Sequence, residues 1–293
     1  MTIDVLFPFY GDVGRMRTAV RSVLDQHYED FRLIVIDDGY PDDSVPGWFA
    51  GLSDPRVVYE RNTVNLGLNG NFRKALSYAT NPLMTIMGCD DVMLPHHLSW
   101  LAAAAEAHPE AQIFQPGVFV IDDRGAPSRT LTEQIKDVIR GKGQGQRVLK
   151  GEDLAVSLLR GNWLYFPSIG WRTETAQAVG FHPGLNTILD LALVLDIVMA
   201  GGSLLTDDIA TFCYRRHRDS FSSAHAVQGD RFDEDRRYFT EVARQLDKLG
   251  WKKAARAARW HITGRLHAAT VIPAAIKQGD IASVKRLAFH LVG

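Results

Sequence analysis

Short apolar runs alternate with amphipathic helical patterns through the first half of the chain. Val5–Phe9 and Arg32–Ile36 are brief, rich in Val, Ile and Leu, and followed by turn-forming residues, which is typical of strands buried in a parallel sheet. Between them, Arg15–Gln26 places its apolar side chains on one face of a helix. A strand, a helix and a strand within about 30 residues indicate a βαβ unit with a right-handed crossover.

The alternation continues well into the chain. Further strands are expected at Val57–Tyr59, Leu83–Met87 and Gln112–Ile121, and helices are expected before Tyr78 and at Trp100–Ala107. Elements in this order predict an α/β fold in which helices flank a mostly parallel sheet.

The pattern weakens in the second half. Leu185–Ala200 is typical of a helix and Ser203–Tyr214 of a strand, and from Ala224 onward the composition shifts to Arg, Lys and Ala. We therefore expect a main domain of residues 1–223 and a helical C-terminal extension of residues 224–293.

Composition excludes several classes of protein. The 33 Lys and Arg residues nearly balance the 34 Asp and Glu residues, so no overall field favours a nucleic-acid partner. Two cysteines are too few for a disulfide framework or a four-ligand zinc site. The chain opens without the basic segment of a signal peptide, and no apolar run approaches the roughly 18 residues of a membrane span. These features predict a soluble, cytoplasmic protein.

Two acidic pairs follow predicted strands. Asp37-Asp38 comes directly after the strand at 32–36, and Asp90-Asp91 follows the strand at 83–87. Ligands of open α/β sheets bind at the carboxyl ends of the strands, and adjacent carboxylates favour a hard divalent cation. Ordinary turn chemistry also places Asp at such positions, but two pairs at successive strand ends favour a site.

The chain resembles the family 2 glycosyltransferases, which have the GT-A nucleotide-sugar fold. The resemblance covers about residues 3–223. The segments that carry it are Pro8 and Tyr10, SVLDQHYEDF at 22–31, Asp-Asp-Gly at 37–39, Asn65–Gly67, CDDVMLP at 89–95 and YRRHRDSFSS at 214–223.

The resemblance implies a nucleotide-diphosphate sugar as donor, with uridine or thymidine as its base. Pro8, Tyr10 and Asp38 match the positions that hold the base: Tyr10 stacks on it, and Asp38 accepts from a ring N–H. Asp37 lies beside Asp38 at the same strand end.

The acid motif of the family departs from its usual form here. The Asp-x-Asp motif falls at Gly88-Cys89-Asp90, so the first acid is missing and Asp91 follows. The resemblance implies that Asp90 contacts the ribose and Asp91 binds Mn²⁺ or Mg²⁺, with the missing charge at Gly88 weakening cation affinity.

Basic residues and a further acid complete the implied site. Arg215 and His217 match the segment that covers the diphosphate, although such a cluster is often only a solvated loop. Asp190 matches the general base at a helix start, among apolar neighbours that raise the pKa of a carboxyl. A helix cap is the alternative role for Asp190, Leu189 replaces the usual acid beside it, and Asp196 is the alternate base.

Asn162 and Trp163 fall between the nucleotide half and Asp190, where an acceptor sugar is expected. Aromatic faces do pack on sugars, although core filling is their commoner use. Glycan, lipid-linked and small-molecule acceptors are all compatible with this pattern.

The last 43 residues (251–293) carry eight Lys or Arg against one Asp, interleaved with apolar residues. This pattern is compatible with a peripheral contact at the inner face of a membrane, with a homodimer contact, or with a helical cap on the domain.

The predicted function is inverting, metal-dependent transfer of a hexosyl group, of the kind used in polysaccharide biosynthesis. The alternative is a degenerate member that binds a nucleotide or sugar without transfer, which Gly88 and Leu189 would favour because each replaces an acid. A phospho-acceptor regulator also carries acids at strand ends, but its fold leaves the segment at 214–223 unexplained.

Overall fold

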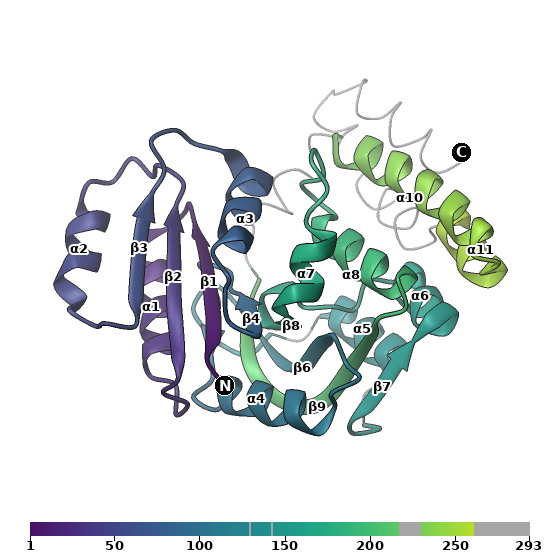
Figure 1. Ribbon diagram of the computed structural model, residues 1–293, viewed down its shortest axis with the longest axis horizontal. Coiled ribbons are helices and arrows are strands. Elements are labelled where there is room, and N and C mark those ends of the chain that lie inside the picture. The colour runs from purple at the N-terminus through teal and green to yellow at the C-terminus, as the bar shows by residue number, and fades with distance from the viewer. Residues whose placement is uncertain (129, 142, 217–229, 261–293) are drawn as a thin grey trace.

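The computed structural model describes residues 1–128, 130–141, 143–216 and 230–260. Within these ranges a single sheet crosses the molecule in the order β3-β2-β1-β4-β8-β6-β9-β5, and β7 pairs with β9 off this path (Figure 1). The predicted α/β architecture, with helices on a mostly parallel sheet, is confirmed.

The N-terminal half of the sheet is parallel. Its strands are β3 (Val57–Arg61), β2 (Phe31–Asp37), β1 (Ile3–Phe9) and β4 (Leu83–Ile86). All residues of β1 and β4 are buried, which explains why these segments lack apolar–polar alternation.

Three helices connect these strands. They are α1 (Val13–Leu24), α2 (Ser44–Leu52) and α3 (Gly67–Ser77). Asp12 begins α1 as its N-cap, because its carboxylate accepts from the backbone N–H of Arg15 at 2.7 Å.

The second half of the sheet mixes directions. Its strands are β5 (Val92–Met93), β6 (Ile113–Ile121), β7 (Arg147–Lys150), β8 (Gly170–Arg172) and β9 (Ser203–Arg215). β8 runs antiparallel to β4 and β6, while β9 is parallel to β6 and antiparallel to β5 and β7. The helices of this half are α4 (His97–Ala107), α5 (Leu131–Arg140), α6 (Gly151–Arg160), α7 (Thr173–Val179) and α8 (Leu189–Met199), with a 3-10 turn at Phe166–Ser168.

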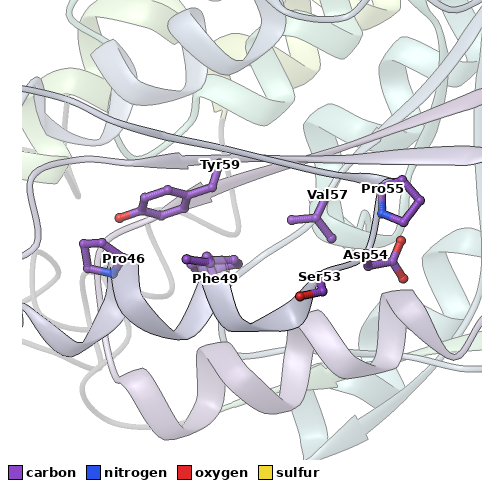
Figure 2. A pocket seen from close by; sticks show the side chains of 8 residues that line it. Pro46, Phe49, Ser53, Asp54, Pro55, Val57 and Tyr59 are labelled. Carbon is purple, nitrogen blue, oxygen red and sulfur yellow. The ribbon is translucent and has the colours of Figure 1, made fainter.

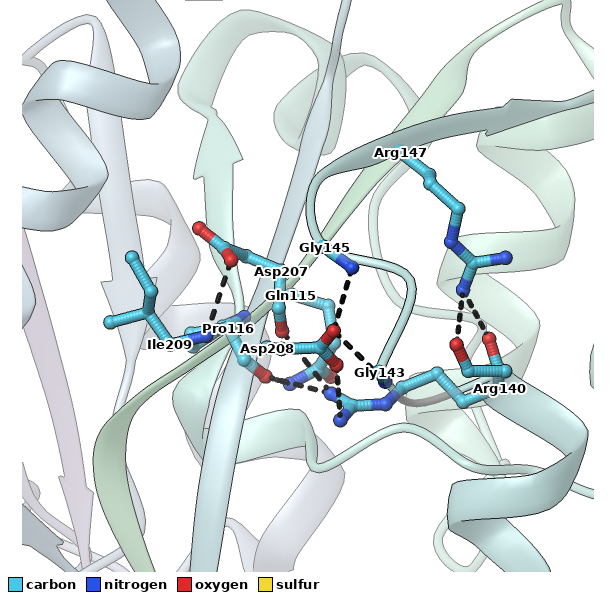
Figure 3. Close-up of polar contacts among 10 residues, drawn as sticks. Gln115, Pro116, Arg140, Gly143, Gly145, Arg147, Asp207, Asp208 and Ile209 are labelled. Atoms are coloured by element: carbon cyan, nitrogen blue, oxygen red, sulfur yellow. Dashed lines mark hydrogen bonds and ion pairs between the residues drawn. The ribbon is translucent and has the colours of Figure 1, made fainter.

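A polar cluster joins β9 to the loop before β7 (Figure 3). The Asp208 carboxylate accepts from the backbone N–H groups of Gly143 (3.0 Å) and Gly145 (2.8 Å) and pairs with Arg140 at 3.4 Å. At Gly117 a Cβ atom would lie 2.5 Å from the Asp208 carbonyl oxygen, so only glycine allows β6 to approach β9 at this irregular register.

The C-terminal helices α10 (Asp230–Lys248) and α11 (Lys252–Trp260) pack on each other, and α11 packs on α6 (Figure 1). Phe239 and Leu246 of α10 belong to the same buried cluster as Leu193 of α8. In the part of the chain that is described, no helix is both long and apolar enough to cross a membrane.

The predicted boundary near residue 224 lies outside the described residues and stays a prediction. So does the predicted membrane or dimer contact of the basic tail, because residues 261–293 also lie outside.

A shallow hollow of about 470 Å³ lies between α2 and the edge strand β3 (Figure 2). Its lining combines the aromatic rings of Phe49 and Tyr59 with Pro46, Pro55 and Val57. Phe49 and Tyr59 stack with their centroids 4.6 Å apart, so these rings also serve the packing of α2 on the sheet.

Asp4 anchors the amino end of β1. Its fully buried carboxylate accepts from the Arg32 guanidinium (2.9 and 3.0 Å), the backbone N–H groups of Thr80 and Asn81, and the Asn81 side chain. Burial by itself raises the pKa of Asp4, but these hydrogen bonds outweigh it, so the pKa lies below its ordinary value.

We expect Asp4→Ala to lower the free energy of unfolding by about 1.5–3 kcal/mol, because it leaves buried donors unpaired. Urea unfolding at neutral pH measures this change. Asp30→Ala is the control, because the Asp30 carboxylate is exposed and accepts a hydrogen bond from the Thr2 hydroxyl. Because the folded pKa is lowered, the difference should shrink as the pH falls through that pKa. A difference that persists at acid pH would contradict the electrostatic origin.

Candidate active site at the carboxyl ends of the strands

The carboxyl ends of β1, β2 and β4 lie side by side. β1 pairs with both neighbours, Phe9 lies opposite Asp37, and the backbone N–H of Asp38 donates to the Phe9 carbonyl at 2.9 Å. The segments that follow these strands, at residues 10, 38 and 88–91, therefore emerge at one edge of the sheet.

Asp38 is held rigidly at this edge. It is 2% exposed, and its Oδ1 accepts from the Asn62 side chain (2.7 Å) and the backbone N–H of Leu66 (2.8 Å). Asn62 is itself fixed by Lys74 at 2.7 Å. Both donors reach Oδ1, and among the residues that the structure describes none donates to Oδ2, so Oδ2 can accept from an N–H group of a ligand.

Tyr10 and Asp37 have different surroundings. Tyr10 is 53% exposed, with its ring edge-on to Tyr40 at 5.2 Å, so a ring face is available to a ligand. Asp37 is fully buried and accepts from the Tyr59 hydroxyl (2.6 Å) and the backbone N–H of Tyr40 (2.8 Å). Asp37 therefore shapes the turn. Pro8 is buried within β1.

Asp90 and Asp91 lie next to the end of β9. The Asp91 carboxylate, 1% exposed, accepts from the backbone N–H of Arg215 at 2.7 Å. The Arg215 guanidinium donates to the carbonyls of Asp90 (2.8 Å) and Asp122 (2.9 Å). Burial and the neighbouring Asp90 charge raise the pKa of Asp91 well above its usual range, and Arg215 opposes the rise.

Gly88 has a steric role in this turn. A Cβ atom at position 88 would lie 2.5 Å from Oδ2 of Asp91 and 3.3 Å from Oδ1 of Asp90. The acid expected from the family motif at this position therefore cannot coexist with the observed place of the Asp91 carboxylate. The acids of this turn are therefore Asp90 and the buried Asp91, and position 88 carries none.

The described residues contain no group of three or more His, Cys, Asp and Glu side chains that could hold a metal ion. Asp91 provides a carboxylate at this strand end, with Asp90 next to it. Carboxylate oxygens are the ligand type that Mg²⁺ and Mn²⁺ take, and a diphosphate would supply further oxygen ligands. His217, also expected at the diphosphate, lies outside the described residues.

Asp190 lies in the first turn of α8, which has Ile188 as its N-cap residue, so Asp190 is not the cap. Asn162 donates to Oδ2 of Asp190 at 3.4 Å. Burial raises the pKa of the Asp190 carboxyl, and hydrogen bonds and the Lys136 charge offset only part of this rise. A carboxylate with a raised pKa is suited to general base chemistry.

Asp196, the alternate base, is hydrogen-bonded to the ring of His182. Burial raises the pKa of Asp196 as well, but its carboxylate already has the His182 side chain as a partner.

Tyr214 lies near the end of β9. Burial, and after it the charges of Asp91, Asp90 and Asp190, raise the pKa of its hydroxyl. The acid turn and the predicted base therefore both act electrostatically on one side chain, although Asp91 and Asp190 are 99 positions apart in sequence.

Lys136 of α5 interacts electrostatically with Asp190, which the sequence did not reveal. Its Nζ donates to the Leu164 carbonyl at 3.0 Å and lies 4.3 Å from the centre of the Tyr165 ring. Burial and the Arg216 charge lower the pKa of Lys136 to about 8, against the opposing charge of Asp190. The capping box of Thr130 and Glu133 was the available signal for this helix.

The two predicted acceptor residues, Asn162 and Trp163, have different surroundings. Asn162 contacts Asp190, whereas Trp163 is fully buried and its Nε1 donates to the Ser157 hydroxyl at 3.0 Å. No face of the Trp163 indole is open to a sugar, so Trp163 fills the core and is not part of the site that we propose.

The sequence matches the model of the family described as "Glycosyl transferase family 2" over residues 4–164. Among curated proteins, an uncharacterized glycosyltransferase of Nostoc (alr2836) is 25% identical over 185 residues, which cover 61% of this chain and 53% of that protein. The chain spans about half the length of the curated relatives that it matches.

Two solved structures have a similar fold. S. aureus TarS 1-349 in complex with UDP-GlcNAc aligns with a TM-score of 0.64 at 15% identity, covering 83% of this chain and 66% of that one. The mannosyltransferase PcManGT of Pyrobaculum calidifontis, in complex with GDP-Man and Mn²⁺, aligns with a TM-score of 0.63 at 14% identity, covering 98% and 78%. The expected GT-A fold is thus confirmed. Because the family match extends over more than half of its residues, this chain belongs to glycosyl transferase family 2.

Proposed function

We propose that this protein transfers a hexosyl group from a UDP- or dTDP-sugar to a hydroxyl acceptor, with inversion at the anomeric carbon and with Mn²⁺ or Mg²⁺ on the diphosphate. The observation that carries the proposal is that Asp38 and the Asp90-Asp91 turn follow neighbouring parallel strands at one edge of the sheet, with the end of β9 hydrogen-bonded to Asp91. Family membership and the nucleotide-sugar complexes of the similar folds support it.

In this proposal the donor base lies between Tyr10 and Asp38. The exposed Tyr10 ring offers a stacking face, and Oδ2 of Asp38 accepts a ring N–H. Asp37 and Pro8 support this pocket from the buried side.

Asp91 would hold the divalent cation, which supplies positive charge to the departing diphosphate, and Asp90 would contact the ribose. Arg215 keeps the two acids in place through its backbone N–H and guanidinium. His217 is proposed to contact the diphosphate from the segment that follows.

The acceptor oxygen attacks the anomeric carbon while the bond from that carbon to the diphosphate oxygen breaks. Asp190 takes the acceptor proton, and Asn162 orients its carboxylate. The nearby Lys136 charge stabilises the ionised form of Asp190 against the cost of its burial.

The rival function is nucleotide or sugar binding without transfer. Gly88 and Leu189 favoured it because each replaces an acid, yet both have structural roles here. Gly88 makes room for Asp91, and Leu189 packs in the core at 7% exposure. The departures therefore do not require loss of activity.

The acceptor class stays open between glycan, lipid-linked and small-molecule hydroxyls. The predicted cytoplasmic location, with peripheral membrane or homodimer contact through the C-terminal helices, also stays a prediction. The exposed Trp260 ends the described part of that surface.

We expect Asp38→Asn to weaken UDP binding by about 1.5–3 kcal/mol, because a charged acceptor is replaced by an amide. Titration calorimetry with UDP, dTDP and GDP measures the change. Asp43→Asn, at a carboxylate that is 96% exposed on the same loop, is the control. If Asp38→Asn binds each of the three nucleotides with the same affinity as the wild type does, Asp38 does not contact the base.

We expect Gly88→Ala to weaken Mn²⁺-dependent UDP binding, because the added methyl displaces the Asp91 carboxylate at a cost of about 1–3 kcal/mol. Gly47→Ala, where a Cβ atom meets nothing within 4 Å, is the matched control. Asp91→Ala should abolish the effect of Mn²⁺, measured as the shift that the ion adds to thermal unfolding with UDP. Metal dependence that survives both changes would exclude Asp91 as the ligand.

We expect Asp190→Asn to leave UDP affinity unchanged and to lower turnover by about 10²–10⁴. Release of UDP or GDP from UDP-GlcNAc and GDP-mannose, with water as a slow acceptor, measures this before an acceptor is known.

The pH dependence gives a second test of Asp190. A base works when ionised, so turnover should rise as the pH increases through the pKa of Asp190, which burial places above that of an exposed Asp. Asp190→Asn should lose this acid limb. Wild-type turnover in Asp190→Asn would direct the search to Asp196, and no turnover in either form would favour the binding-only rival.

A further inference from the structure

The loop between α7 and α8 determines where Asp190 lies, and two distant elements hold it. From α3, the Asn69 side chain donates to the carbonyls of His182 (2.9 Å) and Leu185 (2.5 Å). Asn69 therefore fixes the first part of the loop against the nucleotide half of the domain.

Glu234 of α10 holds the second part. Its carboxylate, 7% exposed, accepts from the backbone N–H groups of Asn186 (3.0 Å), Thr187 (2.8 Å) and Ile188 (3.3 Å), and from the Thr187 hydroxyl (2.8 Å). Three successive N–H groups thus converge on one carboxylate, and the last belongs to the residue that begins α8.

Burial of the Glu234 carboxylate is unfavourable in free energy unless these donors stay in place. A buried carboxylate loses several kcal/mol of hydration, which only well-placed hydrogen bonds offset. Apolar residues of α10 such as Phe239 and Val242 also pack in the core, and Asp235, next to Glu234, is buried as well. The carboxylate adds a constraint on direction, because it determines the path of the chain two residues before Asp190.

We propose that Glu234 is a positioning residue for the reaction: it sets the carboxylate of Asp190 at the acceptor site from the C-terminal extension. This inference rests on the proposed function. It also means that the active site depends on a helix outside residues 4–164, where the family match lies.

The experiment compares Glu234→Gln, Thr187→Val and a control in the full chain. Glu234→Gln keeps the size of the side chain and removes its charge, while Thr187→Val removes only the hydroxyl donor. Glu241→Gln is the matched control, because Glu241 lies on the exposed side of α10 with Arg244 at 3.2 Å. The readouts are hydrogen exchange of the amides at 186–188, UDP affinity, and the turnover and KM for UDP-GlcNAc and GDP-mannose.

We expect Glu234→Gln to lower turnover by about 10–100-fold, the size of effect that misplacement of a catalytic group produces. Amides 186–188 should exchange faster, while UDP affinity and KM stay at wild-type values. Thr187→Val should show smaller changes in the same direction, and Glu241→Gln should show none.

Three results would overturn the proposal. These are wild-type turnover in Glu234→Gln, unchanged exchange at 186–188, or loss of UDP affinity in parallel with turnover, which would indicate a general structural role. If the wild type releases nucleotide from neither donor, the proposed function fails. The exchange comparison still decides whether Glu234 anchors the loop, and equal exchange would reject it.

Discussion

The buried contact between Asp91 and the backbone of Arg215 is the constraint on which the site depends. It joins the turn after β4 to the end of β9, which are separated by 124 positions in sequence. The contact is possible because Gly88 leaves room for the carboxylate, and the Arg215 guanidinium closes the turn from the other side. The buried carboxylate depends on the glycine, the backbone N–H and the arginine together. The geometry of the acid turn should therefore change when any one of them is replaced or displaced.

Burial acts differently on the carboxylates of this protein, according to how many donors surround each. Asp4 is fully buried yet has a lowered pKa, because five hydrogen bonds stabilise its charge. Asp91 and Asp190 have fewer donors, and burial raises the pKa of both. The hydrogen-bonded carboxylate of Asp4, with its lowered pKa, stabilises the fold. Carboxylates with raised pKa values, such as Asp91 and Asp190, are typical of functional sites.

The loop that precedes the proposed base is held by one residue from each half of the chain. Asn69 ties its loop to the nucleotide half, and Glu234 ties it to the C-terminal helices. Residues of the extension and of α8 pack in the same buried cluster. A change in that packing therefore acts on the helix that carries Asp190.

The parallel half of the fold and the candidate residues at its strand ends could be predicted from the amino-acid pattern. Apolar runs report burial directly, and turn residues mark where strands such as β1 and β2 stop, so Asp38 and Asp91 were identifiable without coordinates. The remaining features depend on tertiary packing. The short strands β7 and β8 pair over long separations, and no feature of the sequence places Lys136 near Asp190 or Glu234 on the loop at 186–188. Trp163 looked available to a sugar but is buried, because exposure depends on which elements pack together and local sequence does not encode that.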